Sequence, residues 1–147
     1  MTLKEQLNDA MKTAMKARDS LRLSAVRMVR AAIKNREIDT RTELDNQAVT
    51  DVISTLAKQR RESILMYREG NRPDLAEKEE SELAVLLEFL PTQLNLDEID
   101  TLVSQVILDI EAQGVKDMGR VMKAVTPLTA GKADGKVVSE TVRRLLA

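Results

Sequence analysis

The fold is decided by residues 45–90, which read DNQAVTDVISTLAKQRRESILMYREGNRPDLAEKEESELAVLLEFL. Apolar residues recur there every three or four positions, which is the spacing of an amphipathic helix, and no part alternates as a strand would. Asp45-Asn46 offers an N-cap, Gly70-Asn71 interrupts the pattern, and Pro73 suits a helical first turn. Pro91 then stops the pattern. The stretch predicts two long helices joined by a short turn.

A charged residue interrupts the apolar stripe of each of these helices. Arg60 falls in the middle of the first stripe and Glu79 in the middle of the second. A short turn near residues 70–73 would make the helices antiparallel and bring the two positions level. Because an unpaired buried charge is costly, we predict a structural ion pair between Arg60 and Glu79, with a phosphate-binding role for Arg60 as the alternative. Arg22 lies between apolar positions in the same way, without an evident partner.

Helical periodicity extends over the rest of the chain. Two capping boxes, Thr2 with Glu5 and Asn95 with Glu98, predict helix starts. Further signals are a cap at Asp19 or Ser20 for a helix to about Ile38, the end of a helix at Gly114, a cap at Asp117, a break at Pro127 and a cap at Asp134. We therefore predict an all-α protein with an N-terminal four-helix domain, residues 1–92, and a small three-helix C-terminal domain, residues 93–147.

The charges are segregated along the chain although the net charge is only −1. Residues 12–41 hold nine Lys/Arg against three Asp/Glu, residues 74–111 hold eleven Asp/Glu against one Lys, and residues 116–144 hold seven Lys/Arg against three Asp/Glu. Such blocks present basic surfaces to a partner without a large global positive charge. The pattern indicates binding and says nothing about catalysis.

Composition argues against several classes of protein. The chain contains no Cys and no His, so zinc sites and much general-base chemistry are not expected. Acids at Asp97, Glu98 and Asp100 look like ordinary compensation of a helix dipole rather than a magnesium site. No apolar run approaches the ~20 residues of a membrane span. We expect a soluble, cytoplasmic protein that needs no cofactor, metal or membrane.

Two basic features could bind phosphate. Arg27, Arg30 and Lys34 follow one another at i, i+3 and i+7 on a helix, and Lys12 and Lys16 could extend this stripe. A solvated face is the plain interpretation of the stripe, and contact with a phosphate backbone is the functional one. Tyr67 and Phe89 are the only aromatic residues and both are expected to be buried, so base-stacking platforms are excluded. Any RNA would be bound through its shape and phosphates.

The second feature is the loop from Gly131 to Lys136. It lacks the Walker spacing, Val137 stands where Ser or Thr should hold magnesium, and no strand precedes it, so nucleotide hydrolysis is rejected. One interpretation is a corner between helices, with Gly131 left-handed and Asp134 as N-cap. The other is that Lys132, Lys136 and the N–H groups of the last helix hold a nucleic-acid phosphate.

Several blocks of residues resemble the YqeY-like (GatB/YqeY) family over essentially the whole chain. The two most specific are DMGRVMK at 117–123 and GKADGK at 131–136. The others are SAVRM at 24–28, KQRRES at 58–63, RPDL at 72–75, EKE at 77–79 and FLPTQL at 89–94.

The resemblance implies two helical domains, the second similar to the tail of the B subunit of the aspartyl/glutamyl-tRNA amidotransferase. That tail holds tRNA while the chemistry happens elsewhere, and the matching positions here are Arg120, Lys123, Lys132 and Lys136. It also implies an association with carbon–nitrogen ligase activity with glutamine as amido-N-donor, although amidase and ATP-binding residues are absent.

Our sequence-based hypothesis is a non-catalytic, tRNA-binding accessory protein. A first rival is a component of such a carbon–nitrogen ligase that acts with other subunits, in contact with aminoacyl-tRNA or amidotransferase machinery. A second rival is a protein-interaction adaptor whose acidic segment, with Glu77, Glu80 and Glu82, docks a basic partner.

Overall fold

A computed structural model describes residues 1–147 and contains seven α-helices, one short 3-10 helix and no strand. The predicted all-α class is therefore confirmed. The chain divides into two compact units, Met1–Leu90 and Pro91–Ala147, and each is described by itself. The predicted division into domains of residues 1–92 and 93–147 stays a prediction. None of the helices has the length and apolar character needed to cross a bilayer.

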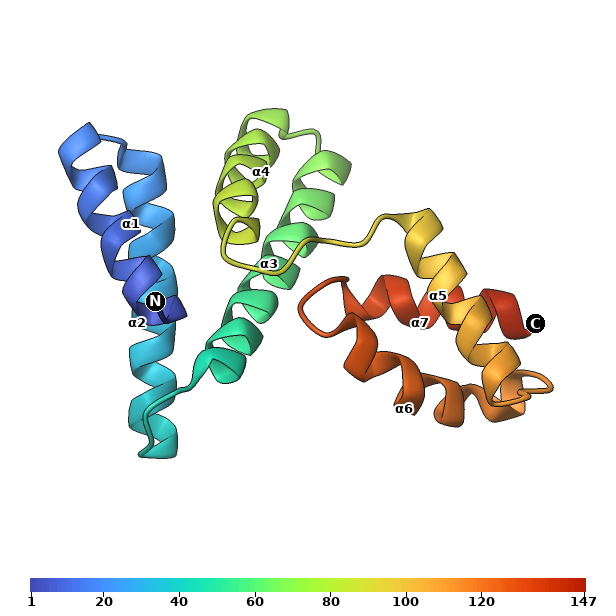
Figure 1. Cartoon of the computed structure of the whole chain (residues 1–147). Coiled ribbons are helices and arrows are strands. Elements are labelled where there is room, and N and C mark those ends of the chain that lie inside the picture. The colour runs from blue at the N-terminus through green and yellow to red at the C-terminus, as the bar shows by residue number, and fades with distance from the viewer. The chain divides into compact units, whose positions relative to one another are not determined.

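The first unit contains four helices, which Figure 1 shows as two hairpins. They are α1 (Leu3–Ala17), α2 (Ser20–Thr40), α3 (Asn46–Glu69) and α4 (Pro73–Leu87). Helix α2 packs against α1, α3 and α4, and α3 packs along α4. The start of α1 has the predicted capping box, and Asp19 and Asp45 accept backbone N–H groups at the starts of α2 and α3. Local side-chain chemistry thus sets these three starts.

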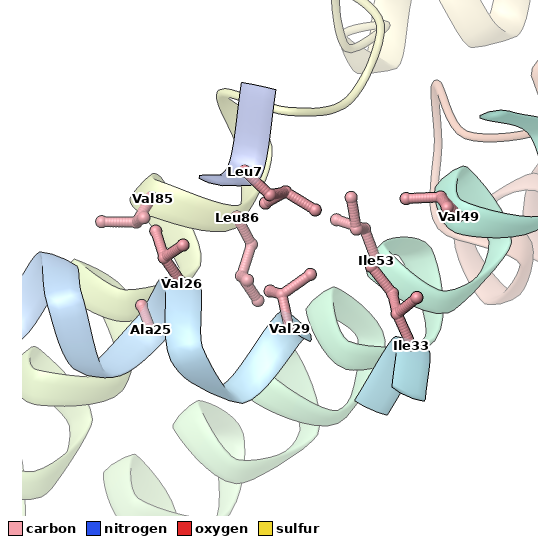
Figure 2. Close-up of a cluster of buried hydrophobic side chains, with 9 residues drawn as sticks. All are labelled: Leu7, Ala25, Val26, Val29, Ile33, Val49, Ile53, Val85 and Leu86. Carbon is pink, nitrogen blue, oxygen red and sulfur yellow. The ribbon is translucent and has the colours of Figure 1, made fainter. Parts of the chain in front are cut away.

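All four helices contribute to one apolar core in this unit. Figure 2 shows its side chains: Leu7, Ala25, Val26, Val29, Ile33, Val49, Ile53, Val85 and Leu86. Tyr67 and Phe89, which we expected to be buried, are only partly buried, and Phe89 packs against this core. The fully buried part of the core consists of aliphatic side chains, and most of them are Val and Ile.

The second unit packs α5 (Leu96–Asp109), α6 (Met118–Thr129) and α7 (Gly135–Leu146) around a separate core. Its buried residues are Ile99, Val103, Val106, Val121, Val125, Val138, Val142 and Leu146. Asn95 and Glu98 form the predicted capping box, and Asp134 caps α7. Gly131 has a φ of 74°, the left-handed conformation predicted for it.

Two boundaries in this unit differ from the prediction. Helix α5 ends at Asp109, and a 3-10 helix, Val115–Asp117, occupies part of the segment before α6. Pro127 does not end α6, which continues to Thr129. Only two helical residues follow Pro127, so its missing N–H and its ring disturb just the end of the helix.

Candidate nucleic-acid interface

A groove of about 470 Å³ lies between α1 and α2 of the first unit. The three residues of the predicted basic stripe, Arg27, Arg30 and Lys34, all line it. The remaining lining residues are Lys4, Leu7 and Asn8 of α1 and Ala31, Ile33 and Glu37 of α2. The structure therefore brings the stripe together with residues of a second helix in one concave site.

Helical geometry explains this arrangement. On α2, Val29 and Ile33 point into the core, while Arg27, Arg30 and Lys34 lie beside that face and remain exposed. Leu7 of α1 is only 1% exposed and Ile33 of α2 only 5%, so both belong to the core beneath the groove and offer almost no surface to a ligand. Arg27, Arg30 and Lys34 lie beside these buried residues and are exposed to water.

The one carboxylate in the groove is already compensated. Glu37 forms an ion pair with Lys4 and accepts the backbone N–H of Leu44 at 2.8 Å. The Lys4 hydrogen bond and then the Leu44 N–H lower the pKa of Glu37, and the same bond raises the pKa of Lys4. Glu37 therefore leaves the positive charge of the other groove residues largely intact.

No acidic side chain pairs with the stripe. Arg27 and Lys34 have no ion-pair partner, and Arg30 reaches only the sulfur of Met11, with Nη1 2.8 Å from Sδ. A guanidinium beside a thioether keeps its full charge. The groove thus presents three uncompensated positive charges.

The Gly131–Lys136 loop of the second unit is held by backbone contacts. Leu94 N–H donates to the carbonyl of Lys132 at 2.8 Å, and Gln93 Nε2 donates to that of Gly131 at 2.8 Å. The side chains of Lys132 and Lys136 remain exposed and have no acidic partner. The loop is therefore a fixed corner that carries two free ammonium groups.

The helix end beside this loop is less open to an anion than predicted. The carboxylate of Asp134 accepts the N–H of Lys136 at 3.1 Å. That N–H is therefore already satisfied, and a negative charge already lies at the N-terminus of α7. Any phosphate at this corner would depend on the lysine side chains.

Arg120 and Lys123, the remaining predicted RNA-binding residues, differ in their surroundings. Arg120 donates from Nη2 to the carbonyl of Ile110 at 2.8 Å, and its Nη1 lies 3.2 Å from Asp117 Oδ1. The contact with Ile110 gives a hydrogen-bond donor to a carbonyl group at the C-terminal end of α5, which is a common role of arginine. Lys123 is exposed and has no ion-pair partner. Asp117 does not cap α6 with its side chain, because its carboxylate accepts the N–H of Gln113.

Arg60 lies between α3 and α4, where it contacts two carboxylates. Its Nε is 3.2 Å from Glu79 Oε2 and 3.0 Å from Glu82 Oε2, and its Nη2 reaches the sulfur of Met28. Arg60 and Glu79 are thus in contact as expected, although Arg60 Nε and Glu79 Oε2 do not form an aligned hydrogen bond. Glu82 was missed. Its position three residues after Glu79, on the same helix face, was the signal that could have revealed it.

Other charged residues also turn out to have structural partners. Arg22, which seemed to lack one, pairs with Glu88 at 2.5 Å. Of the acids proposed for an adaptor, Glu80 pairs with Arg68 and Glu82 with Arg60, so two of the three are already engaged.

The acids considered for magnesium do not come together as a site. Glu98 belongs to the capping box of α5, and Asp100 pairs with Arg144. Nowhere in the chain do three or more Asp or Glu side chains form a group that could hold a metal ion.

These features define an all-helical protein of two compact units with exposed basic residues on each. The chain belongs to the YqeY-like family: a sequence profile of the family described as "Yqey-like protein" matches residues 4–146. The resemblance found in the sequence motifs is thereby confirmed.

Related fungal proteins carry the name "Altered inheritance of mitochondria protein 41, mitochondrial". The protein of Vanderwaltozyma polyspora is 37% identical over 123 residues, which cover 81% of this chain and 66% of the relative. Those of Kluyveromyces lactis and Lachancea thermotolerans are 37% and 38% identical over 109 residues, which cover 71% of this chain and 58% of each relative. The chain therefore spans about three fifths of the length of these relatives.

The relatives' names correct one prediction. They refer to mitochondria, so the cytoplasmic location expected from the sequence is wrong. A chain without Cys suits any reducing compartment, and its composition could not separate the two locations. The names mention neither an RNA nor an amidotransferase.

Proposed function

We propose that this chain binds folded RNA, with tRNA as the first candidate, and does so without catalysing a reaction. The observation that supports this proposal is that most of the predicted RNA-binding cations are exposed and unpaired. Of the seven residues selected from the sequence, six are exposed and free of an acidic partner: Arg27, Arg30, Lys34, Lys123, Lys132 and Lys136. Only Arg120 is held in an ion pair.

The physical reason is the behaviour of a polyanion. A phosphate backbone releases condensed counterions when Lys or Arg neutralises it, which favours binding and makes the affinity depend steeply on salt. Cations already neutralised by neighbouring acids would gain little in this way. The acids of this chain instead pair with other residues, such as Arg22, Arg60, Arg68 and Arg144.

The aromatic content of the chain indicates how it would recognise an RNA. Half-buried Tyr67 and Phe89 offer no platform for bases, so discrimination between RNAs would come from shape and from the spacing of phosphates. A folded RNA with closely spaced phosphate ridges suits this, and the family resemblance makes tRNA the first to test. Because the relatives carry mitochondrial names, mitochondrial tRNA belongs in the test.

The experiment is a filter-binding titration of tRNA and of duplex DNA between 50 and 200 mM salt. Lys132→Ala combined with Lys136→Ala should weaken tRNA binding about 5- to 30-fold, from roughly 0.5–1 kcal/mol for each exposed contact. It should also reduce the salt slope by about two. The control combines Lys58→Ala with Lys116→Ala, two exposed lysines without ion pairs, and should bind as the wild type does.

Two results would contradict the proposal. Either tRNA binding is absent at 50 mM salt, or duplex DNA binds as tightly as tRNA. Equal losses in the two double variants would mean that net charge alone matters and that the Gly131–Lys136 loop has no special part.

A further inference from the structure

The Gly131–Lys136 loop is bonded to the segment through which the chain enters the second unit. This entry segment comprises residues 91–94, directly after the boundary between the units and before α5. Gln93 Nε2 donates to the carbonyls of Pro91 and Gly131, at 2.8 Å in each case. A side-chain amide has two N–H donors, so both are used. A single side chain thus joins the entry segment to the loop.

The backbone of the loop depends on these bonds because its conformation is irregular. Gly131 has a φ of 74°, and the N–H of Lys132 donates back to the carbonyl of Thr129 at 2.9 Å. The carbonyls of Gly131 and Lys132 lie beyond the end of α6 and have no helical partner. They accept from the amide of Gln93 and from the N–H of Leu94 instead.

The direction of these carbonyls matters to an anion. A carbonyl oxygen carries partial negative charge and repels a phosphate. Because the oxygens of Gly131 and Lys132 are bonded to the entry segment, they are directed toward it, and the exposed side chains of Lys132 and Lys136 are left to contact a phosphate. A loop that is already held in one conformation also loses less entropy when it binds.

We propose that Gln93 is a positioning residue for RNA binding. Through the carbonyl of Gly131 it holds the loop in the conformation in which Lys132 and Lys136 contact phosphate. This inference deepens the proposed function and rests on it. Gln93 is partly buried and its amide is already used by two carbonyls, so it acts through the lysines and does not itself contact the RNA.

Gln93→Met tests this role without changing any charge. Methionine has a similar length but no N–H donor, so the carbonyl of Gly131 loses its partner. The matched control is Gln105→Met in the same unit. Gln105 Nε2 donates at 2.8 Å to Asp109 on the exposed side of α5, so this variant loses an amide hydrogen bond that does not involve the loop.

The experiment is a filter-binding titration of tRNA over a range of salt concentrations, in the wild type and in the double variant Lys132→Ala, Lys136→Ala. We expect Gln93→Met to bind tRNA about 3- to 10-fold more weakly, with an unchanged salt slope because no cation is lost. In the double variant, Gln93→Met should cause less than about a twofold further loss, since the lysines through which it acts are gone. Gln105→Met should bind as the wild type does.

Amide NMR spectra of the full chain supply a second measurement. In Gln93→Met the signals of the Gly131–Lys136 loop should shift while those of α5, α6 and α7 are retained, because Gln93 lies outside the three helices. In the wild type, tRNA should slow hydrogen exchange at the Leu94 N–H, which donates to Lys132, by about 3- to 10-fold. The reason is that coupling between loop closure and RNA binding is reciprocal.

Several results would overturn the inference and leave the proposed function standing. They are wild-type affinity in Gln93→Met, an equal loss in Gln105→Met, an undiminished further loss in the double variant, and unchanged exchange at Leu94. Loss of the folded spectrum of α5, α6 and α7 would also overturn it, because Gln93 would then hold the whole unit. If the wild type does not bind tRNA at about 50 mM salt, the proposed function is itself wrong and the role of Gln93 is wrong with it.

Discussion

Replacing Arg60 with methionine removes the guanidinium that lies 3.2 Å from Glu79 and 3.0 Å from Glu82. The three side chains are only 17%, 17% and 12% exposed. Methionine fills much of the volume of the arginine stem but leaves two carboxylates close together without a counter-charge. Removing one partner of a buried ion pair costs about 3–5 kcal/mol, mostly because the other charge stays buried and unpaired.

The lower end of that range applies to this site. The carboxylates retain some exposure, and Arg60 Nε and Glu79 Oε2 do not form an aligned hydrogen bond. We therefore expect Arg60→Met to lower the free energy of unfolding of the first unit by about 3 kcal/mol. For a domain of this size that corresponds to a fall in Tm of roughly 12–24 °C. Thermal and urea unfolding followed by circular dichroism would measure both quantities.

An exposed ion pair between the same two helices supplies the control. Arg68 Nη2 lies 2.8 Å from Glu80, and both side chains are nearly half exposed. Arg68→Met should cost less than about 1 kcal/mol, since water solvates the carboxylate left behind. A triple variant, Arg60→Met with Glu79→Leu and Glu82→Leu, should recover most of the stability, because an apolar replacement removes every buried charge. If Arg60→Met costs no more than Arg68→Met, the argument from burial fails.

Two further predictions concern a helix start and an ion pair. Asn95→Ala removes the side chain that accepts the Glu98 N–H at 2.8 Å, so it should lower the stability of the second unit by about 1 kcal/mol. Amide hydrogen exchange in that unit would measure this loss, and an unchanged exchange rate would contradict the prediction. Glu37→Gln breaks the pair with Lys4. Because that pair and the Leu44 N–H hold the pKa of Glu37 below its ordinary 4.5, the wild type should have the higher Tm at pH 7 and lose this advantage as the pH falls below 4.5 and through the lowered pKa. A Tm advantage that does not shrink as the pH falls would refute the linkage.

The features that the sequence predicted correctly depend on neighbours within a few residues. The capping boxes at Thr2 and Asn95, and the caps at Asp19, Asp45 and Asp134, need only a side chain and a backbone N–H two or three positions away. The contact between Arg60 and Glu79 reaches further along the chain. It was still predictable, because a short turn between antiparallel helices fixes which positions are level.

Glu82 was missed although it lies three residues after Glu79 on the same helix face, but two other missed contacts depend on where a side chain finds its partner in space. Arg120 looks like a free cation in the sequence, yet it reaches the carbonyl of Ile110 because α5 ends earlier than expected. Arg22 finds Glu88 beyond α4, 66 positions along the chain. No helical wheel of a single segment contains either contact.

The groove between α1 and α2 was also not predictable from a single helical segment. Periodicity placed Arg27, Arg30 and Lys34 on one face of α2, but the hollow beside them exists only because α1 brings Leu7 and Asn8 to that face. Whether three cations form an open stripe or line a groove depends on the packing of a second helix, and the pattern of α2 alone does not contain that information.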